Sequence, residues 1–212
     1  MSLESQPQII LATESSQLLD SFSKVNIDFT PNNSIFTPSK QDSRFDPMQF
    51  AKDMSLEKAN QVNSNKQNLI ISTYRVLSLE GKLLLKPKNR SESHQQLKDI
   101  SGKTINYITG VTIIDNKKSR RINQLHTFDV TIANLSKQEQ DWYTITKEFL
   151  TKPPIDIYNL GLRFVKKTEG TETPIRLIIE QLINLGYEDF LMPKPKNMNT
   201  PAKNTGSHLP FL

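Results

Sequence analysis

The stretch from residue 69 to residue 89 combines a strand pattern with side chains that bind anions. It reads LIISTYRVLSLEGKLLLKPKN, in which the turn dipeptide Glu80-Gly81 joins two apolar runs, so we expect a β-hairpin. The second run leads to Lys86 beside Pro87, which places a cation at a rigid turn. The first run offers a tyrosine and an arginine but no carboxylate. These residues predict one wall of an anion-binding site, to which the first strand of the hairpin contributes no carboxylate.

The composition excludes several classes of chemistry. The 212 residues include no cysteine, which excludes disulfides, thiolate catalysis and cysteine-based zinc sites. The histidines His94, His126 and His208 are far apart in sequence and show none of the usual metal-ligand spacings. The net charge of +5 comes from basic residues spread along the chain, which is typical of a solvated surface. Nucleic acid is therefore not an expected partner.

The apolar runs and the N-terminus indicate where the protein works. No apolar run approaches the length of a membrane span. The first residues, MSLESQPQ, resemble neither a signal peptide nor an arginine-rich transit sequence. We therefore expect a soluble intracellular protein, either cytoplasmic or within an organellar or cytoskeletal assembly.

The hydrophobic pattern predicts alternating strands and helices. Besides the hairpin, strands are expected at 9–12, 104–115, 120–135 and 162–167, and helices at 15–25, 47–62, 91–100, 136–150 and 175–185. Ser15 or Ser16 is suited to cap the first of these helices. Ser136, with Glu139 three residues on, predicts a capping box. This order of elements favours an α/β protein around a mixed sheet.

The chain divides into three predicted segments, which are an N-terminal extension over residues 1–8, one domain over 9–190 and a tail over 191–212. The tail contains four prolines and three lysines and is almost free of apolar residues until its end. Its composition fits a disordered, solubilising segment. The other interpretation is a docking arm whose last apolar side chains insert into a partner.

Five pieces of sequence in a fixed order resemble the Maf-type (septum-formation-like) nucleotide pyrophosphatases. They are IILATES, LEKANQV, GKLLLKPKN and, within LKDISGKTINYITGVTII, the Ser-Gly turn and the strand through Thr-Gly-Val. The match runs from about residue 9 to about residue 185. Through it, Lys58 takes the lysine of a Lys-Ala helix, Lys86 takes the lysine of a Gly-Lys-Pro hairpin, and Ser15 lies in a serine-rich turn.

The resemblance implies a fold and a chemistry. The implied fold is the elongated α/β structure of Maf and ITPase-like proteins, a mixed sheet with flanking helices and a cleft between two lobes. Members of the family cleave nucleoside triphosphates, often modified ones, to the monophosphate and pyrophosphate. That chemistry needs carboxylates to hold magnesium or manganese and to activate water, and cations to hold the triphosphate.

The acid positions implied by the resemblance carry other residue types here. The family's catalytic aspartate falls on Tyr74, its second catalytic acid falls on Leu150, and its acidic loop falls on 34–38, which contains no acid. A slip in the second alignment would restore only Asp156. Each lost group is worth about 3 kcal/mol, or roughly 100-fold in rate. We therefore predict no catalytic residue, no metal site and no cofactor.

The residues left over from the family pattern predict a remnant phosphate-binding wall made by Ser15, Lys58 and Lys86. The structural alternative is that Lys58 is an exposed helix residue and that Lys86 only ends its hairpin. Arg75 either adds charge to the same cleft or faces solvent on an alternating strand.

Three functions stay open at this point. The leading hypothesis is a catalytically inactive Maf-like pseudoenzyme that serves as a structural or interaction subunit of a larger assembly, with protein partners. One alternative is a divergent nucleoside triphosphate pyrophosphatase that recruits other acids, such as Asp156 or Glu169, to magnesium or manganese. The other is a nucleotide-binding module that acts through Lys58 and Lys86 without hydrolysis.

Overall fold

The computed structural model describes residues 7–32, 36–39, 42, 44–65, 67–146 and 155–188. Its helices and strands, in chain order, are β1 (Gln8–Ala12), α1 (Ser16–Lys24), β2 (Thr30–Pro31), α2 (Pro47–Asn60), β3 (Asn68–Leu79), β4 (Lys82–Leu84), α3 (Arg90–Ile100), β5 (Thr104–Asp115), β6 (Arg120–Ile132), α4 (Lys137–Ile145), a 3-10 helix (Leu160–Phe164), β7 (Val165–Glu169) and α5 (Ile175–Asn184). Within these residues, no helix combines the length and the apolar character that a membrane span requires.

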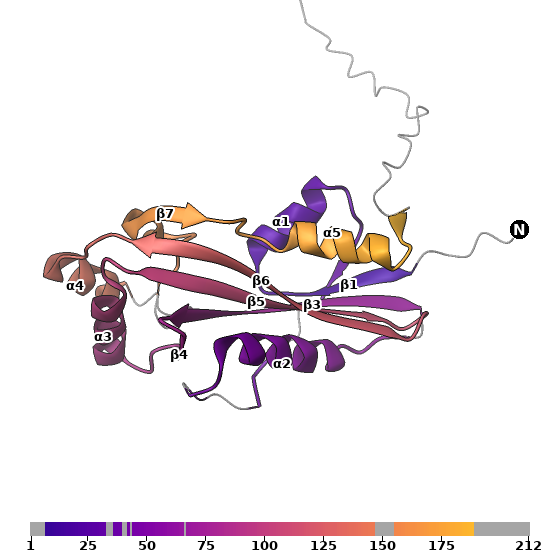
Figure 1. The fold of residues 1–212 in the computed structure, drawn as a ribbon, viewed down its shortest axis with the longest axis horizontal. Helices are drawn as coiled ribbons and strands as arrows, with labels where there is room; N and C mark the ends of the chain where they lie inside the picture. The colour runs from indigo at the N-terminus through magenta and orange to yellow at the C-terminus, as the bar shows by residue number, and fades with distance from the viewer. Residues whose placement is uncertain are drawn as a thin grey trace, which may run out of the picture.

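One mixed sheet runs through the molecule. Its strand order is β2-β1-β3-β5-β6-β7, and β4 pairs with β3 beside this path. The β1 strand runs parallel to β2 and to β3, whereas every other pair is antiparallel. The long strands β3, β5 and β6 extend along the elongated molecule, with α2 on one face of the sheet and α1 and α5 on the other (Figure 1). The predicted α/β class with a mixed sheet and flanking helices is confirmed.

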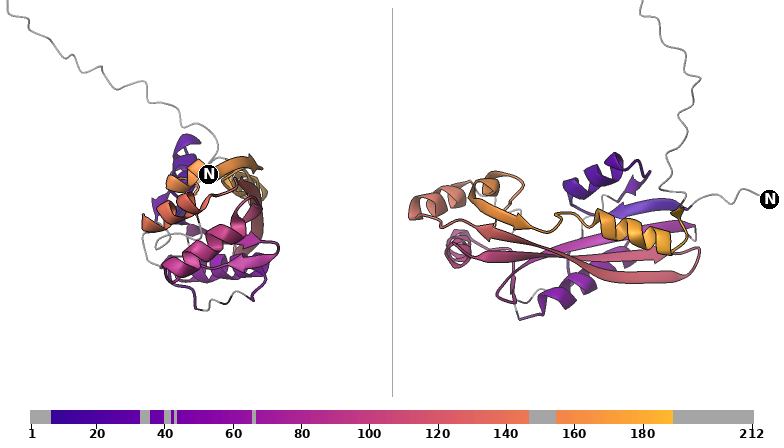
Figure 2. Two further views of the ribbon diagram at one scale, coloured as in Figure 1. Left: turned by 90° about the vertical axis from the view of Figure 1, so that its left-hand side faces the viewer. Right: turned by 45° about the horizontal axis from the view of Figure 1, so that its top comes forward.

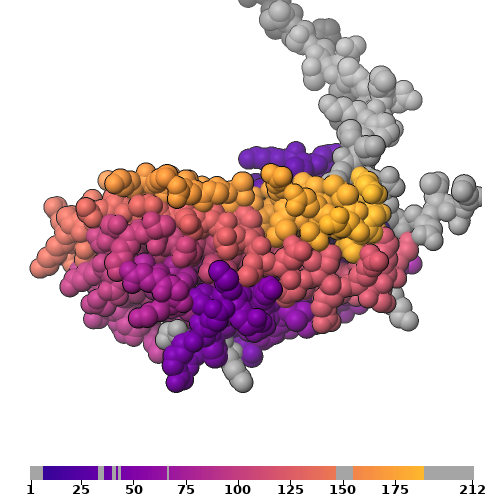
Figure 3. Space-filling view, viewed as in Figure 1, coloured from indigo at the N-terminus to yellow at the C-terminus, as the bar shows by residue number. Residues whose placement is uncertain are grey.

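Two hydrophobic clusters fill the two ends of this elongated structure. One cluster packs α1 and α5 against β1, β3 and β5, and includes the buried residues Phe22 and Leu182. The other packs α3, α4 and the 3-10 helix against β5 and β6, and includes Tyr143 and Phe164. We call the end that contains α1 and α5 the first lobe and the end that contains α3 and α4 the second lobe. The strands β5 and β6 pass through both lobes and join them into one body (Figure 2). Along one side, β6, β7 and α5 form a continuous surface (Figure 3).

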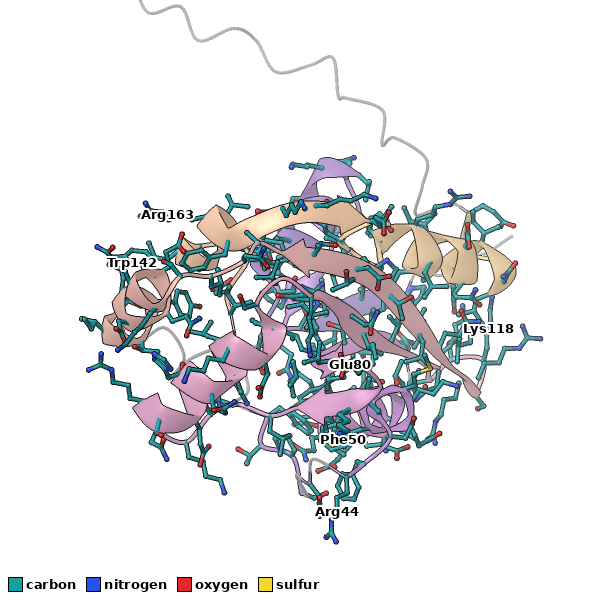
Figure 4. All side chains as sticks on the ribbon, turned by 60° about the vertical axis from the view of Figure 1, so that its left-hand side comes forward. Arg44, Phe50, Glu80, Lys118, Trp142 and Arg163 are labelled. Atoms are coloured by element: carbon teal, nitrogen blue, oxygen red, sulfur yellow. The ribbon has the colours of Figure 1, made fainter. Side chains whose placement is uncertain are left out.

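The far end of the second lobe carries an aromatic side chain beneath an arginine. Trp142 of α4 is half-buried and packs edge-on against Phe164, with ring centroids 6.1 Å apart. The guanidinium of Arg163 lies 4.8 Å from the Trp142 ring, and the two side chains lie together in Figure 4. Trp142 therefore contributes to the packing of α4 on the 3-10 helix.

The sheet has a gap along one edge of β3. The β1 strand pairs with β3 only as far as Ala12 opposite Ser72, and β4 begins to pair at Leu84 opposite Leu77. Between these points, residues 73–76 pair with β5 on one side and with neither β1 nor β4 on the other. The gap opens because the chain leaves the sheet after β1 to begin α1.

The helix α2 lies close to the sheet because β5 carries a glycine beneath it. A Cβ atom on Gly110 would lie only 2.0 Å from the carbonyl oxygen of Ala51 in α2, so no larger residue fits this contact. The N-terminus of the helix is fixed by Asp46, whose side chain accepts a hydrogen bond of 2.7 Å from the Gln49 amide. Pro47 occupies the first turn, as predicted. These contacts set the position of the Lys58 side chain two turns further on.

Several local predictions are confirmed and others need correction. The hairpin turns at Glu80-Gly81 as expected, and Ser136 forms the predicted capping box with Glu139. The strand expected at 162–167 begins only at Val165, because the preceding residues form the 3-10 helix, whose Phe164 is buried among the residues of the second lobe. The strand expected to reach residue 135 ends at Ile132.

Some predictions fall on residues that the structure does not describe. The helix expected over 136–150 is described as α4 up to Ile145, and residues 147–154, which include Leu150, lie outside the described residues. The tail over 191–212 also lies outside them. The division into an extension, a domain and a tail therefore stays a prediction.

Candidate functional site

A cleft of about 320 Å³ lies over the gap in the sheet. Its floor is the segment of β3 that has no strand partner on one edge, residues 73–76, together with Leu77. One wall comes from the β1–α1 turn and α2, and the other comes from the end of the β3–β4 hairpin and from the segment 155–158. The cleft therefore lies between the two lobes, where these four parts of the chain meet.

Lys58 lies in the first wall and is buried. Its side chain is only 5% exposed, and its Nζ atom lies 3.2 Å from the Glu14 carboxylate, whose side chain is 77% exposed. The ammonium also lies 5.9 Å from the centre of the Phe36 ring. The interpretation of Lys58 as an exposed helix residue is therefore wrong, because α2 directs this ammonium into the cleft.

Ser15 lines the same wall but is occupied as a helix cap. Its Oγ atom accepts a hydrogen bond from the Leu18 amide and donates one to the Gln17 side chain, both at 3.2 Å. The neighbouring Thr13 shares a hydrogen bond of 2.6 Å with Thr73, which fastens the end of β1 to β3. The predicted cap is confirmed, whereas a role of Ser15 in phosphate binding stays a prediction.

Lys86 follows β4 and lines the opposite wall. Its side chain is exposed, and the next residue, Pro87, is buried. Among the ion pairs of the described part of the chain, none involves Lys86. The hairpin therefore delivers a cation to the cleft, and its contribution to binding stays a prediction.

Tyr74 lies at the floor of the cleft, where the family resemblance implies an aspartate. Its ring packs edge-on against Phe36 and Phe50, with centroids 5.6 and 6.2 Å away. Burial, followed by the negative charges of Glu14 and Glu57, raises the pKa of Tyr74 to about 12. The phenol is therefore neutral at physiological pH and can donate a hydrogen bond, but it does not offer the hard anionic oxygen that magnesium prefers.

Arg75, the next residue, also lines the cleft. Its guanidinium donates to the Thr109 hydroxyl at 3.2 Å, to the Tyr158 hydroxyl at 3.1 Å and to the Glu172 carbonyl oxygen at 2.9 Å. It also lies 5.4 to 5.9 Å from the rings of Tyr107, Phe128 and Tyr158. The interpretation in which this side chain faces solvent is wrong, because four distant parts of the chain surround it.

Two carboxylates line the cleft, and they differ in availability. Glu14 is exposed beside Lys58. Asp156 is 5% exposed, and its oxygens accept hydrogen bonds from the Tyr158 amide at 3.1 Å and the Asn159 side chain at 2.6 Å. Glu169, the other acid considered from the sequence, contacts Lys167 on β7 and is not among the residues that line the cleft. Within the described ranges, no three histidine or acidic side chains gather as metal ligands do.

Sequence reasoning missed one feature of this cleft and left a second one open. Glu14, within the quoted piece IILATES, was not recognised as the partner of Lys58, because the ion pair joins residues 44 positions apart. The position of Arg75 was left open between the cleft and solvent, because alternation along a strand predicts that Arg75 and Tyr74 face opposite sides. The available signal was an arginine directly beside the position where the family resemblance implies an acid.

Comparison with known proteins identifies similar chains. The dTTP/UTP pyrophosphatase of Pyrococcus abyssi is 32% identical over 169 residues, which span 75% of this chain and 87% of that protein. The dTTP/UTP pyrophosphatase of Caldicellulosiruptor bescii is 29% identical over 196 residues, 85% of this chain and 96% of that protein. The 7-methyl-GTP pyrophosphatase of Pseudoalteromonas atlantica is 34% identical over 95 residues, 45% of this chain and 49% of that protein.

A solved structure and a family model complete the comparison. The crystal structure of a dITP/XTP pyrophosphatase from Mycobacterium abscessus aligns with a TM-score of 0.37 and 11% identity, over 68% of this chain and 96% of that one. The model of the family described as Maf-like protein matches residues 8–176, which include β1, the β3–β4 hairpin and the whole cleft floor. The predicted resemblance is confirmed, and this chain belongs to the Maf-like protein family.

Proposed function

We propose that this protein binds a nucleoside triphosphate in the cleft between its two lobes. The observation that carries the proposal is the buried ammonium of Lys58, which α2 holds in the cleft wall. Arg75 and Lys86 line the same cleft, so cations outnumber the two carboxylates, Glu14 and Asp156. A cleft with an excess of one charge and low-dielectric walls concentrates ligands of the opposite charge.

The size and the apolar lining of the cleft also support a nucleotide. Its volume of about 320 Å³ lies at the lower end of the range of roughly 300–1,000 Å³ that is typical of small-molecule sites. Aromatic rings of Phe50, Tyr74, Tyr107 and Tyr158 line it beside the cations. Of these rings, those of Tyr74 and Tyr158 are only half-buried and offer apolar surface to a base. The similar proteins named as dTTP/UTP and 7-methyl-GTP pyrophosphatases support the same class of ligand.

Hydrolysis of the bound triphosphate is the second candidate function. It is favoured by Glu14, an exposed carboxylate at the cleft, and by the activities that name the similar proteins. The side chains present do not fit a magnesium or manganese site. Glu14 is paired with Lys58, Asp156 is buried with both oxygens engaged, and Tyr74 offers a neutral phenol. We therefore assign no catalytic step to a metal, and we propose that any turnover is slow.

The role as a structural or interaction subunit stays a prediction. The similar proteins are named for nucleotide hydrolysis and favour a nucleotide ligand over that role. A protein that binds a nucleotide without efficient hydrolysis would still be a pseudoenzyme. Nucleotide binding and the binding of protein partners are therefore separate properties. The compartment in which the protein works is also a prediction.

The proposal is tested by calorimetric titration of the purified protein with UTP, dTTP and 7-methyl-GTP. The same samples, with magnesium or manganese, are assayed for pyrophosphate release. We expect measurable binding that is weakened about 10- to 100-fold by Lys58→Met, because a charged hydrogen bond to phosphate is lost. Lys52→Met on the same helix is the matched control, because Lys52 is not among the cleft residues. Equal binding by the wild type and Lys58→Met would contradict the proposal.

A further inference from the structure

The most unusual charge in the cleft is the guanidinium of Arg75. It is half-buried on β3, directly beside Tyr74. In the part of the chain that the structure describes, none of the ion pairs includes it. Charged side chains that leave water are normally paired with an opposite charge. Arg75 is therefore a cation whose anionic partner the described residues do not supply.

The contacts of Arg75 within the protein hold its side chain in place without using all of its hydrogen-bond donors. Its hydrogen bonds go to three neutral oxygens, on Thr109, Tyr158 and Glu172. A guanidinium has five N–H donors, so these three bonds leave two donors for a ligand. The three aromatic rings at 5.4 to 5.9 Å orient the group and partly compensate for its lost hydration. The guanidinium is therefore held in one position with donors left for a ligand.

The gap in the sheet explains why this side chain reaches the cleft. Consecutive residues of a strand point to opposite faces, and Tyr74 accordingly packs with Phe36 and Phe50 while Arg75 packs with Tyr107 and Phe128. In a complete sheet, a neighbouring strand would separate the two faces. Here residues 73–76 have no partner on the β1 side, and both side chains line the same cleft.

We propose that Arg75 binds the phosphate groups of the ligand and supplies, without a metal ion, the positive charge that holds them in this cleft. This inference rests on the proposed nucleotide binding and names how the site achieves it. A guanidinium presents parallel donors that match two oxygens of a phosphate. Lys58 adds a second cation from the wall that α2 forms. A triphosphate between them meets fixed positive charges on two sides.

Tyr158 completes the proposed site beside Arg75. Its hydroxyl accepts the hydrogen bond from Arg75, which leaves its own proton to donate to a phosphate oxygen. Burial raises the pKa of Tyr158, so this proton is retained at physiological pH. The hydroxyl and the guanidinium thus present donors side by side. Neither of these groups requires a divalent ion.

The test is calorimetric titration with UTP and with inorganic tripolyphosphate, each in EDTA and in magnesium. We expect both probes to bind in EDTA, and to bind no more tightly in magnesium, because the ion neutralises part of the ligand's charge. Arg75→Gln should weaken both by about 10- to 100-fold in EDTA. Arg176→Gln is the control, because Arg176 is exposed on α5, pairs with Glu180 and does not line the cleft.

The outcomes separate this inference from the proposed function. Nucleotide binding that requires magnesium, or that Arg75→Gln leaves unchanged, overturns the inference while nucleotide binding itself stands. Absence of binding in both conditions overturns both. If Arg75→Gln does not fold, the wild-type protein decides the matter through the NMR resonance of the Arg75 Nε–H group. Tripolyphosphate in EDTA should shift that resonance, and an unchanged resonance at saturation overturns the inference.

Discussion

Replacing Lys58 with methionine should weaken ligand binding and strengthen the fold. Removing an ammonium from water costs several kcal/mol. The side chain of its partner, Glu14, is 77% exposed at an N–O distance of 3.2 Å, so this ion pair returns only about 0–1 kcal/mol. The Phe36 ring, 5.9 Å away, contributes about 1 kcal/mol more. These contacts do not repay the burial, so Lys58 is a net cost to the folded state.

Methionine retains most of the length of the lysine side chain and adapts to irregular apolar space. The variant leaves Glu14 solvated rather than buried without a partner. We therefore expect Lys58→Met to raise the free energy of unfolding by about 1 kcal/mol. In a domain of this size, that corresponds to an increase in Tm of about 2–4 °C. Urea unfolding and a thermal scan measure the change.

The control for Lys58→Met is a second lysine of α2 that does not line the cleft. Lys52→Met on the same helix should change the free energy of unfolding by less than about 0.5 kcal/mol and should leave nucleotide binding as it is. A decrease in stability of about 1 kcal/mol or more for Lys58→Met would refute the reasoning. It would mean that the ammonium holds α2 to the β1–α1 turn and that its burial serves the fold rather than a ligand.

Three further predictions follow from particular contacts. Gly110→Ala should destabilise the fold by about 3 kcal/mol or more in urea unfolding, because its Cβ would lie 2.0 Å from the Ala51 carbonyl oxygen. Ser136→Ala should cost about 1 kcal/mol in the same assay, because it removes the capping box with Glu139. Burial raises the pKa of Tyr74 from 10.0 to about 12, so its protonated form is favoured in the folded state. Its contribution to stability should be complete below about pH 10 and lost as the pH rises towards about 12, and Tyr74→Phe should remove that part of the alkaline loss.

The sequence predicts the local structure of this protein well, because the signals are local. The Glu80-Gly81 turn and the Ser136 capping box each depend on residues within four positions of one another, and both are confirmed. The 3-10 helix before β7 was missed because its residues read as a strand pattern. The hydrophobic pattern records that Phe164 is buried, but it does not record the path of the backbone around it.

The site was predictable only in part, because its geometry depends on contacts between distant residues. The family resemblance identified Lys58 and Lys86 as candidate cations, and both line the cleft. The burial of Lys58 follows from the close approach of α2 to Gly110, 52 positions away, and no local pattern encodes it. The hydrogen bonds that hold Arg75 come from Thr109, Tyr158 and Glu172. These residues follow Arg75 in the chain by 34, 83 and 97 positions.

The charges of the cleft favour a ligand even though this chain carries other residue types where the family resemblance implies acids. In a metal-dependent site, carboxylates bind the cation, and the cation in turn neutralises the triphosphate. Without a metal ion, the cations of the cleft must neutralise the triphosphate themselves. Here the acid position carries Tyr74, and the next residue is an arginine that neutral oxygens and aromatic rings hold in place. These contacts fix the guanidinium in the fold, and the proposed triphosphate would supply the anion that the ion pairs of the described residues do not give it.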